Sequence, residues 1–456
     1  MPLNHAIPGY VSKHAADIAK TPPGHRFLLY FQACGGGWSD LKEGKREALK
    51  SVTGKGSVDG RFVENLVRRQ KDAAAMDSHL VVCAKTTSPI ATGLGNPHPV
   101  ENGFAFLSPY GIPYLAGSSV KGVIRKAAEE LALFEPDSGW TIPLVWALFG
   151  FEEKSAYIDP VDTGEPKPLQ DERERWRAVF KAWADSFASG NALFSAWLNV
   201  IRSQLPKDKQ AMADNPMLFC KALALQDEQG RDLRRAIHWQ GMLRFWDVFP
   251  ETRNGLAVDI LNPHHKKYYE GTSTPNDSES PVPVFFLTIP PGASCTFICE
   301  MPTVAEETRR RVLDAVGDWK ALMIKAYGHA FNWLGFGAKT AVGYGAMTAG
   351  TGATNEGTGT KPSPGIGNTL GIIATVEEIW ENARITWNPG SQTIMVSVPA
   401  LKKKAEKKCM KPDDRAVVPQ ALHAKLFENK NKKPVNMRVT VEKTGNMYTI
   451  MKMEAP

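Results

Sequence analysis

Residues 335–345 read Gly335-Phe-Gly-Ala-Lys-Thr-Ala-Val-Gly-Tyr-Gly345 and contain four glycines in a G-x-G…G-x-G frame. Glycine is favoured where the backbone needs a positive φ or where another backbone comes close. Successive peptide N–H groups in such a loop form a concavity that binds anions, and Lys339 and Thr340 would add a charge and a hydroxyl. We expect a long helix, 303–334, before this loop and a strand, 340–347, after it.

The residues alone leave three interpretations of this loop. A nucleotide-binding P-loop has a glycine directly before its lysine and leads from a strand into a helix. Here Ala338 precedes Lys339 and the predicted order is helix then loop, which argues against a P-loop. A tight structural turn without a ligand remains possible, as does a loop that grips a nucleic-acid backbone.

Length and charge narrow the class of protein. The 456 residues suffice for two or three domains with a sizeable core. Residues 371–456 carry 15 lysines and arginines against 9 aspartates and glutamates, a net charge of +6, whereas residues 1–370 carry 40 against 39. The basic excess therefore lies near the C-terminus, where it suits either a polyanionic partner or a solvated surface.

Several other classes lack support in the sequence. Six cysteines form no C-x-x-C pair, so neither a zinc ribbon nor a redox pair is indicated. The N-terminus lacks a signal-peptide pattern, and no apolar run approaches the ~18 residues that span a bilayer. We expect a cytoplasmic protein with no membrane contact, metal or cofactor.

Composition also divides the chain. The predicted N-terminal unit is β-loop-α-β, with strands at 25–33 and 80–84 around a helix at 59–77. Residues 136–235, rich in tryptophan and alanine, read as a helical insertion. Residues 350–369 are a Gly/Thr/Pro linker. We predict one domain over 1–349 and a small, basic, mostly-β domain over 370–456, whose size and strand content suit an OB-like fold.

A second candidate phosphate site lies at 117–125. Ser118 or Ser119 is a suitable N-cap for a helix whose apolar residues recur at three- and four-residue steps. Gly117, the serines and Lys121 would then cluster at a helix N-terminus, which favours phosphate. Arg125 falls one turn later on the same face. A simply capped helix is the alternative.

Two further segments are candidates for RNA contact. Residues 86–113 mix proline and glycine with apolar residues, among them Ile90 and Leu94, and predict a protruding hairpin. Such a hairpin can wedge between bases, although a surface loop packed on its own core fits equally well. His264, His265, Lys266 and Lys267 precede two tyrosines, a composition that suits a phosphate and a stacked base.

The pair of motifs PYLAGSSVKGVIR (113–125) and GFGAKTAVGYG (335–345) resembles the two signatures of the RAMP superfamily of CRISPR-associated RNA-binding proteins. The segments DILNPHHKKYY (259–269) and PVPVFFLTIPPGASCTFIC (281–299) resemble the sixth RAMP subunit of type III-B (Cmr) effector complexes. The resemblance covers roughly residues 25–350. It implies an α+β fold with a ferredoxin-like (RRM-like) core, in which the first motif opens a helix beside the guide RNA and the second closes the fold against RNA.

The resemblance also implies a role. It points to a non-catalytic subunit that holds the 3′ part of a CRISPR guide RNA and the guide–target duplex for antiviral defence. Its partners would be guide RNA, target RNA and other RAMP subunits of the Cmr complex. The resemblance places the hairpin residues Ile90, Thr92, Gly93 and Leu94 near the duplex. The implied RNA-binding residues are Gly117, Ser118, Ser119, Lys121, Arg125, His264, His265, Lys266, Lys267, Gly335, Phe336, Gly337, Ala338, Lys339, Thr340, Gly343 and Tyr344.

Some relatives in that superfamily cleave RNA with a histidine or a loop aspartate. The alternative function is therefore a metal-independent endoribonuclease that processes CRISPR repeats. His25 and His329 are the histidine candidates, and Asp40 and Asp59 are the aspartate candidates. None has a second acid or base at a suggestive spacing, so we expect no enzyme activity.

Overall fold

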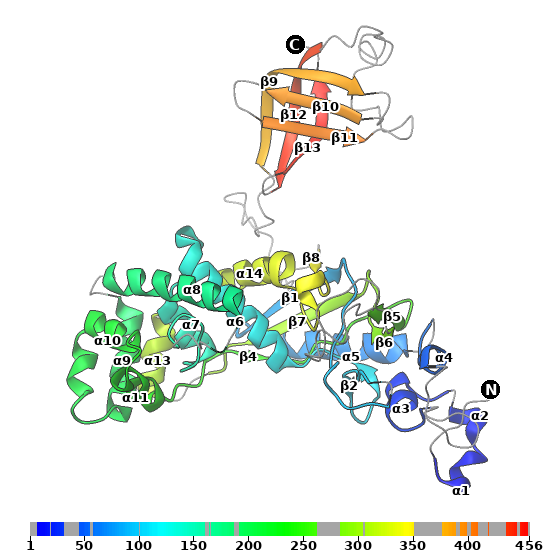
Figure 1. The fold of residues 1–456 in the computed structure, drawn as a ribbon, viewed down its shortest axis with the longest axis horizontal. Coiled ribbons are helices and arrows are strands. Elements are labelled where there is room, and N and C mark those ends of the chain that lie inside the picture. The colour runs from blue at the N-terminus through cyan, green and yellow to red at the C-terminus, as the bar shows by residue number, and fades with distance from the viewer. Residues whose placement is uncertain are drawn as a thin grey trace. The chain divides into compact units, whose positions relative to one another are not determined.

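The protein is described from a computed structural model, in which the chain forms two compact units, Met1–Thr360 and Lys361–Pro456 (Figure 1). Each unit is described by itself. The residues that the structure describes are 7–18, 20–31, 45–54, 58–99, 101–159, 164, 166–186, 191–261, 283–303, 306–350, 376–388, 393–398, 403–408, 418, 435–444 and 447–454.

The first unit is built on a four-stranded antiparallel sheet. Its strands are β1 (His79–Thr86), β4 (Arg244–Phe245), β7 (Ser294–Glu300) and β8 (Met347–Ala349), in the spatial order β4-β7-β1-β8. Helix α6 (Gly117–Phe134) connects the first strand to the second, and α14 (Trp319–His329) lies between the third and fourth. This is the β-α-β-β-α-β arrangement of a ferredoxin-like fold. The predicted α+β fold class is confirmed.

Helix α6 forms because its apolar residues recur at helical spacing. Val120, Ile124, Ala127 and Leu131 are buried along one side of the helix. On β7, Cys295 and Cys299 are buried as well, as their even spacing predicts. The central sheet and this helix therefore form one continuous core.

The segment before the glycine loop differs from the single long helix that we predicted. It consists of α13 (Glu307–Asp314), α14 and a π-helical turn, Ala330–Leu334. The helix restarts at α14 because the Asp318 side chain accepts a hydrogen bond from the Ala321 N–H at 3.0 Å and so acts as an N-cap. The predicted strand 340–347 is also wrong, since Thr340–Val342 is a 3-10 turn before β8.

The N-terminal region is helical, so the strand predicted at 25–33 is wrong. Two prolines precede His25, and Pro23 occupies the first turn of α3, where its fixed φ suits a helix. Of the aromatic and aliphatic residues that suggested a strand, Phe27 in this helix and Phe31 after it are buried in the core, whereas Leu28 and Leu29 are exposed. The helices here are α1 (Gly9–Ser12), α2 (Ala15–Ile18), α3 (Pro23–Leu28), α4 (Lys45–Lys50) and α5 (Gly60–Ala73).

Residues 86–113 do not form a protruding hairpin throughout. Only β2 (Phe106–Leu107) and β3 (Ile112–Pro113) pair as a short hairpin. Ile90 and Ala91 form isolated bridges to Ile289 and Ala338, and the Ile90 side chain is fully buried. The apolar residues of this segment thus fix it to the core, which rules out Ile90 as a wedge between bases.

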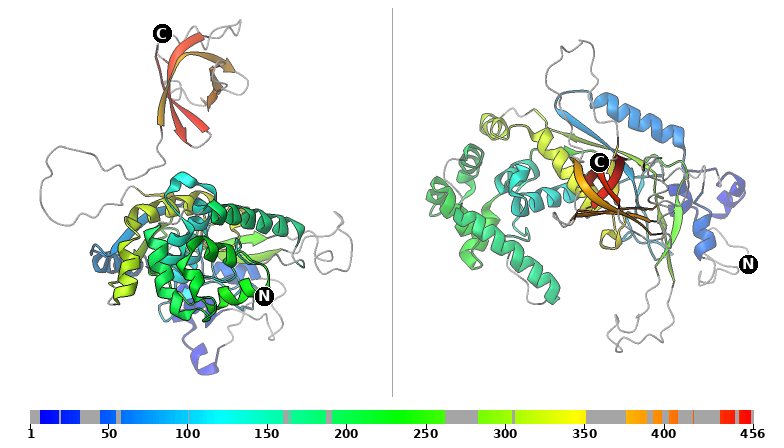
Figure 2. Two further views of the ribbon diagram at one scale, coloured as in Figure 1. Left: turned by 90° about the vertical axis from the view of Figure 1, so that its left-hand side faces the viewer. Right: turned by 90° about the horizontal axis from the view of Figure 1, so that it is seen from above.

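The insertion is helical, as predicted, and its tryptophans serve packing. Trp146 and Trp197 are fully buried, and the Trp146 Nε1–H donates to the Tyr157 hydroxyl at 2.9 Å. Figure 2 shows this helical layer beside the sheet of the first unit. Its elements are the 3-10 turns Pro136–Ser138, Arg202–Gln204 and Gln210–Asp214, and the helices α7 (Ile142–Phe149), α8 (Lys167–Ser186), α9 (Ala192–Ile201), α10 (Pro216–Leu223) and α11 (Glu228–Ala236).

A separate two-stranded pair, β5 (Ala257–Leu261) with β6 (Val284–Thr288), lies beyond the main sheet.

Within the described parts of the chain, no helix is long and apolar enough to cross a bilayer.

The second unit is a five-stranded antiparallel sheet in the order β11-β10-β9-β12-β13. Strand β11 also lies beside β13, so the sheet curls toward closure. Its core includes Trp380, Ile385, Val396 and Ile450. The helix predicted near 418–428 falls outside the described residues, apart from Val418. The strands are β9 (Val376–Asn388), β10 (Thr393–Val398), β11 (Lys403–Lys408), β12 (Val435–Thr444) and β13 (Met447–Glu454).

This division predicts the result of truncation. A chain that ends at Thr360 retains all four strands of the first sheet, and also the Gly350 N–H that bonds to the Cys83 carbonyl at 2.8 Å. We therefore expect chemical denaturation of residues 1–360, followed by tryptophan fluorescence, to remain cooperative. A shorter chain that stops before Met347 removes β8 and serves as the destabilised control. Aggregation of the 1–360 protein would show that the boundary is misplaced.

Candidate nucleic-acid interface

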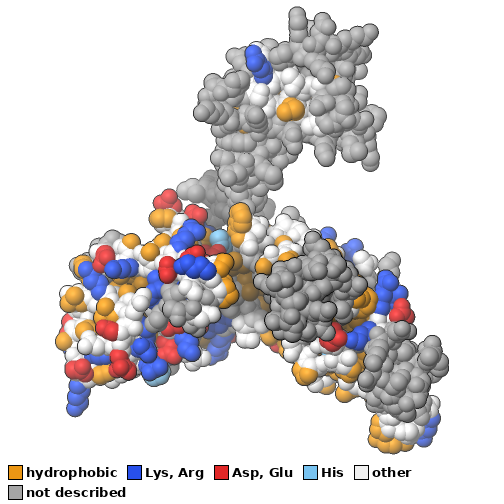
Figure 3. All heavy atoms as spheres, in the orientation of Figure 1, with side chains coloured by type: hydrophobic (Ala, Val, Ile, Leu, Met, Phe, Trp, Pro, Cys, Tyr) orange, Lys and Arg blue, Asp and Glu red, His pale blue; other side chains and the backbone are white. Residues whose placement is uncertain are grey.

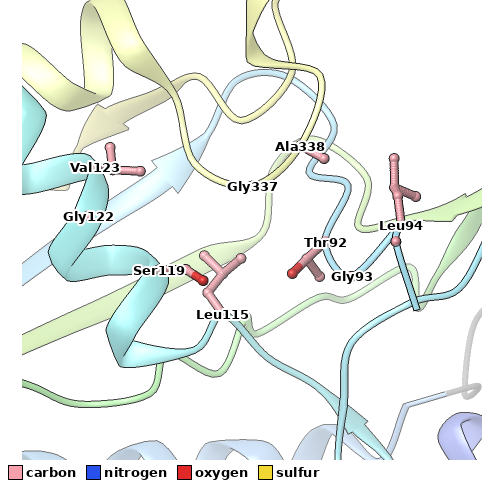
Figure 4. Close-up of a pocket in the computed structure, with 10 residues that line it drawn as sticks. Thr92, Gly93, Leu94, Leu115, Ser119, Gly122, Val123, Gly337 and Ala338 are labelled. Atoms are coloured by element: carbon pink, nitrogen blue, oxygen red, sulfur yellow. The ribbon is translucent and has the colours of Figure 1, made fainter. Parts of the chain in front are cut away.

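Three segments that are far apart in the sequence line one groove in the first unit. The groove has a volume of about 520 Å³ and is bounded by residues 92–95, by Leu115 and the first turns of α6, and by Gly337 and Ala338 of the glycine loop. Figure 4 shows Thr92 and Ser119 from two sides of this groove, with Gly337 and Ala338 above them. The structure thus brings together the glycine loop, the α6 motif and residues 92–94, which the sequence suggested separately.

The glycine loop lies flat against residues 89–91 because its glycines permit close backbone approach. A Cβ at Gly337 would lie 2.3 Å from the Ala91 carbonyl oxygen. The next residue, Ala338, donates its N–H to that same oxygen at 2.6 Å. At the other end of the loop, the Gly345 N–H donates to the Pro89 carbonyl at 2.8 Å. These contacts fix the position of Ala338, which lines the groove.

The tip of the loop has the geometry of an anion-binding nest. Lys339 has φ +60° in the left-handed region, and the 3-10 turn follows directly. Within the described part of the chain, the N–H groups of Lys339, Thr340 and Ala341 donate no hydrogen bond, whereas those of residues 342–345 are all used. Three successive free amides after a left-handed residue form a concavity that suits a phosphate.

Two residues of the loop have structural positions. Phe336 is buried, with its ring 4.9 Å from that of Phe297, so its side chain is not available to contact RNA. Its apolar ring belongs to the core, which only the tertiary structure reveals. The Tyr344 hydroxyl donates to the Asp259 Oδ2 at 2.7 Å. Burial and this hydrogen bond raise the pKa of Tyr344 to about 12, so the hydroxyl stays protonated at neutral pH and braces the loop to β5.

The start of α6 differs from the predicted serine cap. The N-cap residue is Ala116, and the Gly117 N–H donates to the Asp247 Oδ1 at 2.7 Å. A carboxylate at a helix N-terminus occupies the position that a phosphate would favour. Ser118 and Ser119 are exposed in the first turn and make no cap. The helix N-terminus itself is therefore a poorer phosphate site than the loop.

The two cations of α6 have different surroundings. Arg125 contacts Glu129 at 2.9 Å and Glu152 at 3.3 Å, and its side chain is only 13% exposed. Burial opposes its charge, but Tyr157 and the two carboxylates outweigh that effect and raise the pKa of Arg125. The Arg125 guanidinium is thus held in this ion-pair network, and its contact with RNA stays a prediction. Lys121 is half-buried, and burial, followed by repulsion from Arg125, lowers its pKa.

The candidate catalytic residues also have structural partners. The His25 Nε2–H donates to the Pro109 carbonyl at 2.6 Å, and His329 Nε2 lies 2.7 Å from Glu130 Oε2, linking α14 to α6. Asp59 is the N-cap of α5 and accepts from the Phe62 N–H at 3.1 Å. His25 and Asp59 line a second cavity of about 370 Å³, away from the groove.

The remaining candidates lie outside the described residues. These are Asp40 and the segment His264, His265, Lys266 and Lys267. Among the residues that are described, no group of three His, Cys, Asp or Glu side chains could hold a metal ion.

Sequence reasoning missed two apolar side chains beside the loop. Trp333 is 78% exposed in the π-helical turn, and Val342 is 73% exposed in the 3-10 turn. Exposed aromatic side chains next to a phosphate site are typical of surfaces on which bases stack. The sequence feature that could have identified Trp333 is its position outside the apolar stripe of the helix predicted before the loop.

The family model of the RAMP superfamily matches residues 83–348. CRISPR system Cmr subunit Cmr6 from Pyrococcus furiosus is 25% identical over 275 residues, which are 58% of this chain and 66% of that relative. The alignment thus spans just under two thirds of the relative's length.

Solved structures give weaker likenesses. The crystal structure of Cmr6 from Pyrococcus furiosus is 19% identical, with 60% of this chain and 100% of that chain covered and a TM-score of 0.25. The cryo-EM structure of the type III-B Cmr-beta complex bound to cognate target RNA contains a chain that is 16% identical, with 67% and 70% covered and a TM-score of 0.34. The strand order, rather than these low scores, defines the fold. Because the family model covers more than half of its residues, the chain belongs to the RAMP superfamily.

Proposed function

We propose that this protein is an RNA-binding subunit of a type III-B CRISPR effector complex, and that it holds guide RNA in the groove between the glycine loop and α6. The observation that carries the proposal is the convergence of three distant segments on this groove, with three free amides at residues 339–341, directly after the lining residue Ala338. The family membership and the similarity to Cmr6 support the type of complex.

The groove suits a sugar–phosphate backbone because its walls are small. Gly122, with no atom within 4 Å of a Cβ placed on it, leaves open space on the α6 side. The Thr92 and Ser119 hydroxyls offer hydrogen bonds from opposite walls (Figure 4). A phosphate in the nest at 339–341 would receive backbone N–H donors and the Lys339 charge. Such contacts position RNA without reading bases, so sequence choice would come from guide–target pairing.

The proposed role is non-catalytic. Both candidate histidines make hydrogen bonds within the fold, and Asp59 caps a helix. The proposed partners are guide RNA, target RNA and neighbouring RAMP subunits, in the cytoplasm. The test is to purify the tagged protein from its native host and sequence the bound RNA. We expect mature guide RNAs together with other RAMP subunits. Unprocessed repeat transcripts with the protein alone would contradict the proposal.

Lys339→Ala should weaken RNA binding. The change removes one cation beside the nest, so we expect lower affinity and a salt dependence whose slope falls by about 0.7, the value for one phosphate of a single strand. Fluorescence anisotropy with a labelled guide-like RNA at several salt concentrations measures both. Lys181→Ala, on the exposed side of α8, removes the same charge elsewhere and is the matched control. If the two variants have equal slopes, the loop does not hold a phosphate.

A further inference from the structure

The second unit carries a row of polar residues across three neighbouring strands. Arg384 on β9 pairs in register with Ser397 on β10 and with Asn436 on β12. Directly opposed residues of antiparallel strands share one face of a sheet. Arg384 and Asn436 are exposed, and Ser397 is half-buried. We call these three residues the Arg384 row.

The row lies on the outer face of the sheet. Ala383 and Ile385, on either side of Arg384, are both fully buried, as is Val396, which is paired with Ile385. Because successive residues of a strand point to opposite faces, Arg384 faces away from this core. On the same outer face, Met395 is 45% exposed opposite Thr386, and Arg438 is exposed two residues beyond Asn436. The face thus combines cations with an apolar side chain.

The order of the strands in the second unit indicates a type of barrel whose outer face binds ligands. The first strand of the unit is central, and its third and fifth strands lie side by side, which is the connectivity of a five-stranded OB barrel. Outer faces of such barrels offer a sheet on which single strands lie, with cations along the backbone and apolar side chains under the bases.

The two units differ in net charge, and the second unit is the better partner for a polyanion. Residues 371–456 carry a net charge of +6, against +1 for residues 1–370. On the first unit, acidic and basic side chains are interspersed over the helical insertion in Figure 3. Lys404 holds the register position opposite Ser397 on β11, so the four positions paired along the row contain no carboxylate, whereas Glu406 is paired with Met395. The net positive charge suits a polyanion, and the exposed Met395 beside Arg384 suits a base of a nucleic acid.

We propose that the Arg384 row and the adjoining Met395 bind single-stranded nucleic acid. This contact is independent of the groove in the first unit and lies beyond residue 348, where the family match ends. Arg384 would contact a phosphate, and Met395 would contact a base.

The experiment uses the full chain with Arg384→Glu. Anisotropy is measured with an unstructured labelled RNA, with DNA of the same sequence and with the RNA duplex. Charge reversal removes one phosphate contact and adds repulsion, so we expect the Kd for single strands to rise about tenfold at low salt, with a flatter salt dependence. The matched control is Arg235→Glu, an exposed arginine on α11 that changes net charge equally. Tryptophan fluorescence monitors the folding of each variant. If Arg384→Glu disturbs folding, Arg384→Gln tests the same contact without reversing the charge.

Each outcome decides the inference. Selective weakening by Arg384→Glu supports it, and the RNA and DNA arms then identify the source of the strand. Equal effects of Arg384→Glu and Arg235→Glu, or no effect of either, overturn it. So does unchanged nucleic-acid affinity with loss of a co-purifying subunit, which would make the face a protein contact. Lys339→Ala in parallel reports on the groove, so either site can fail while the other stands.

Discussion

Gly122→Trp is expected to abolish most RNA binding while leaving the fold intact. Gly122 is exposed in the second turn of α6 and lines the groove. A Cβ placed there meets no atom within 4 Å, so an indole can enter the groove without displacing the core. Because the groove holds about 520 Å³, an indole takes the space that the RNA backbone needs. We expect at least a tenfold rise in Kd by anisotropy, equivalent to about 1.4 kcal/mol or more.

Gly122→Ala is the matched control for this blockade. It adds only a methyl group and replaces glycine inside a helix, which favours the folded state by up to about 1 kcal/mol. RNA affinity should therefore stay near that of the parent protein while the denaturation midpoint rises slightly. If Gly122→Trp binds RNA as well as Gly122→Ala does, the RNA lies elsewhere.

Gly345→Ala is expected to have the largest effect on stability among changes in the loop. Gly345 has φ +75°, and a Cβ would lie 2.1 Å from the Phe336 carbonyl oxygen, which is backbone and cannot move aside cheaply. The Phe336 N–H also donates to the Gly345 carbonyl at 3.0 Å, so a shift at either residue breaks this contact. We expect a loss of roughly 3 kcal/mol or more, the sum of left-handed strain and a packing clash.

Gly343→Ala separates backbone strain from the clash. Gly343 has φ +91° but no atom within 4 Å of a Cβ placed on it, so only the left-handed strain of ~1–2 kcal/mol applies. Urea denaturation followed by tryptophan fluorescence compares the two variants. RNA binding should fall with Gly345→Ala, because the loop can no longer lie against residues 89–91. Equal destabilisation of the two variants would mean that the close approach at Gly345 contributes nothing.

Much of the architecture could be predicted from local patterns. Helical spacing of apolar residues located α6 and the helical insertion, and β-branched and aromatic content located β5, β6 and β7. The same reasoning failed at 25–33, where prolines start a helix, and at 303–334, where Asp318 starts a second one. In both places a single capping or N-terminal residue outweighs the hydrophobic pattern of its neighbours.

The candidate site divides in a similar way. The sequence by itself marked the glycine loop and the α6 motif, because glycines, a lysine and clustered hydroxyls are local features. Only the tertiary structure decided which groups remain free to bind. Asp247 occupies the start of α6 from 130 residues away, Glu152 holds Arg125, and the core buries Phe336. A hydrogen bond or ion pair satisfies a polar group whatever its distance along the chain, so availability for RNA depends on contacts that no local pattern contains.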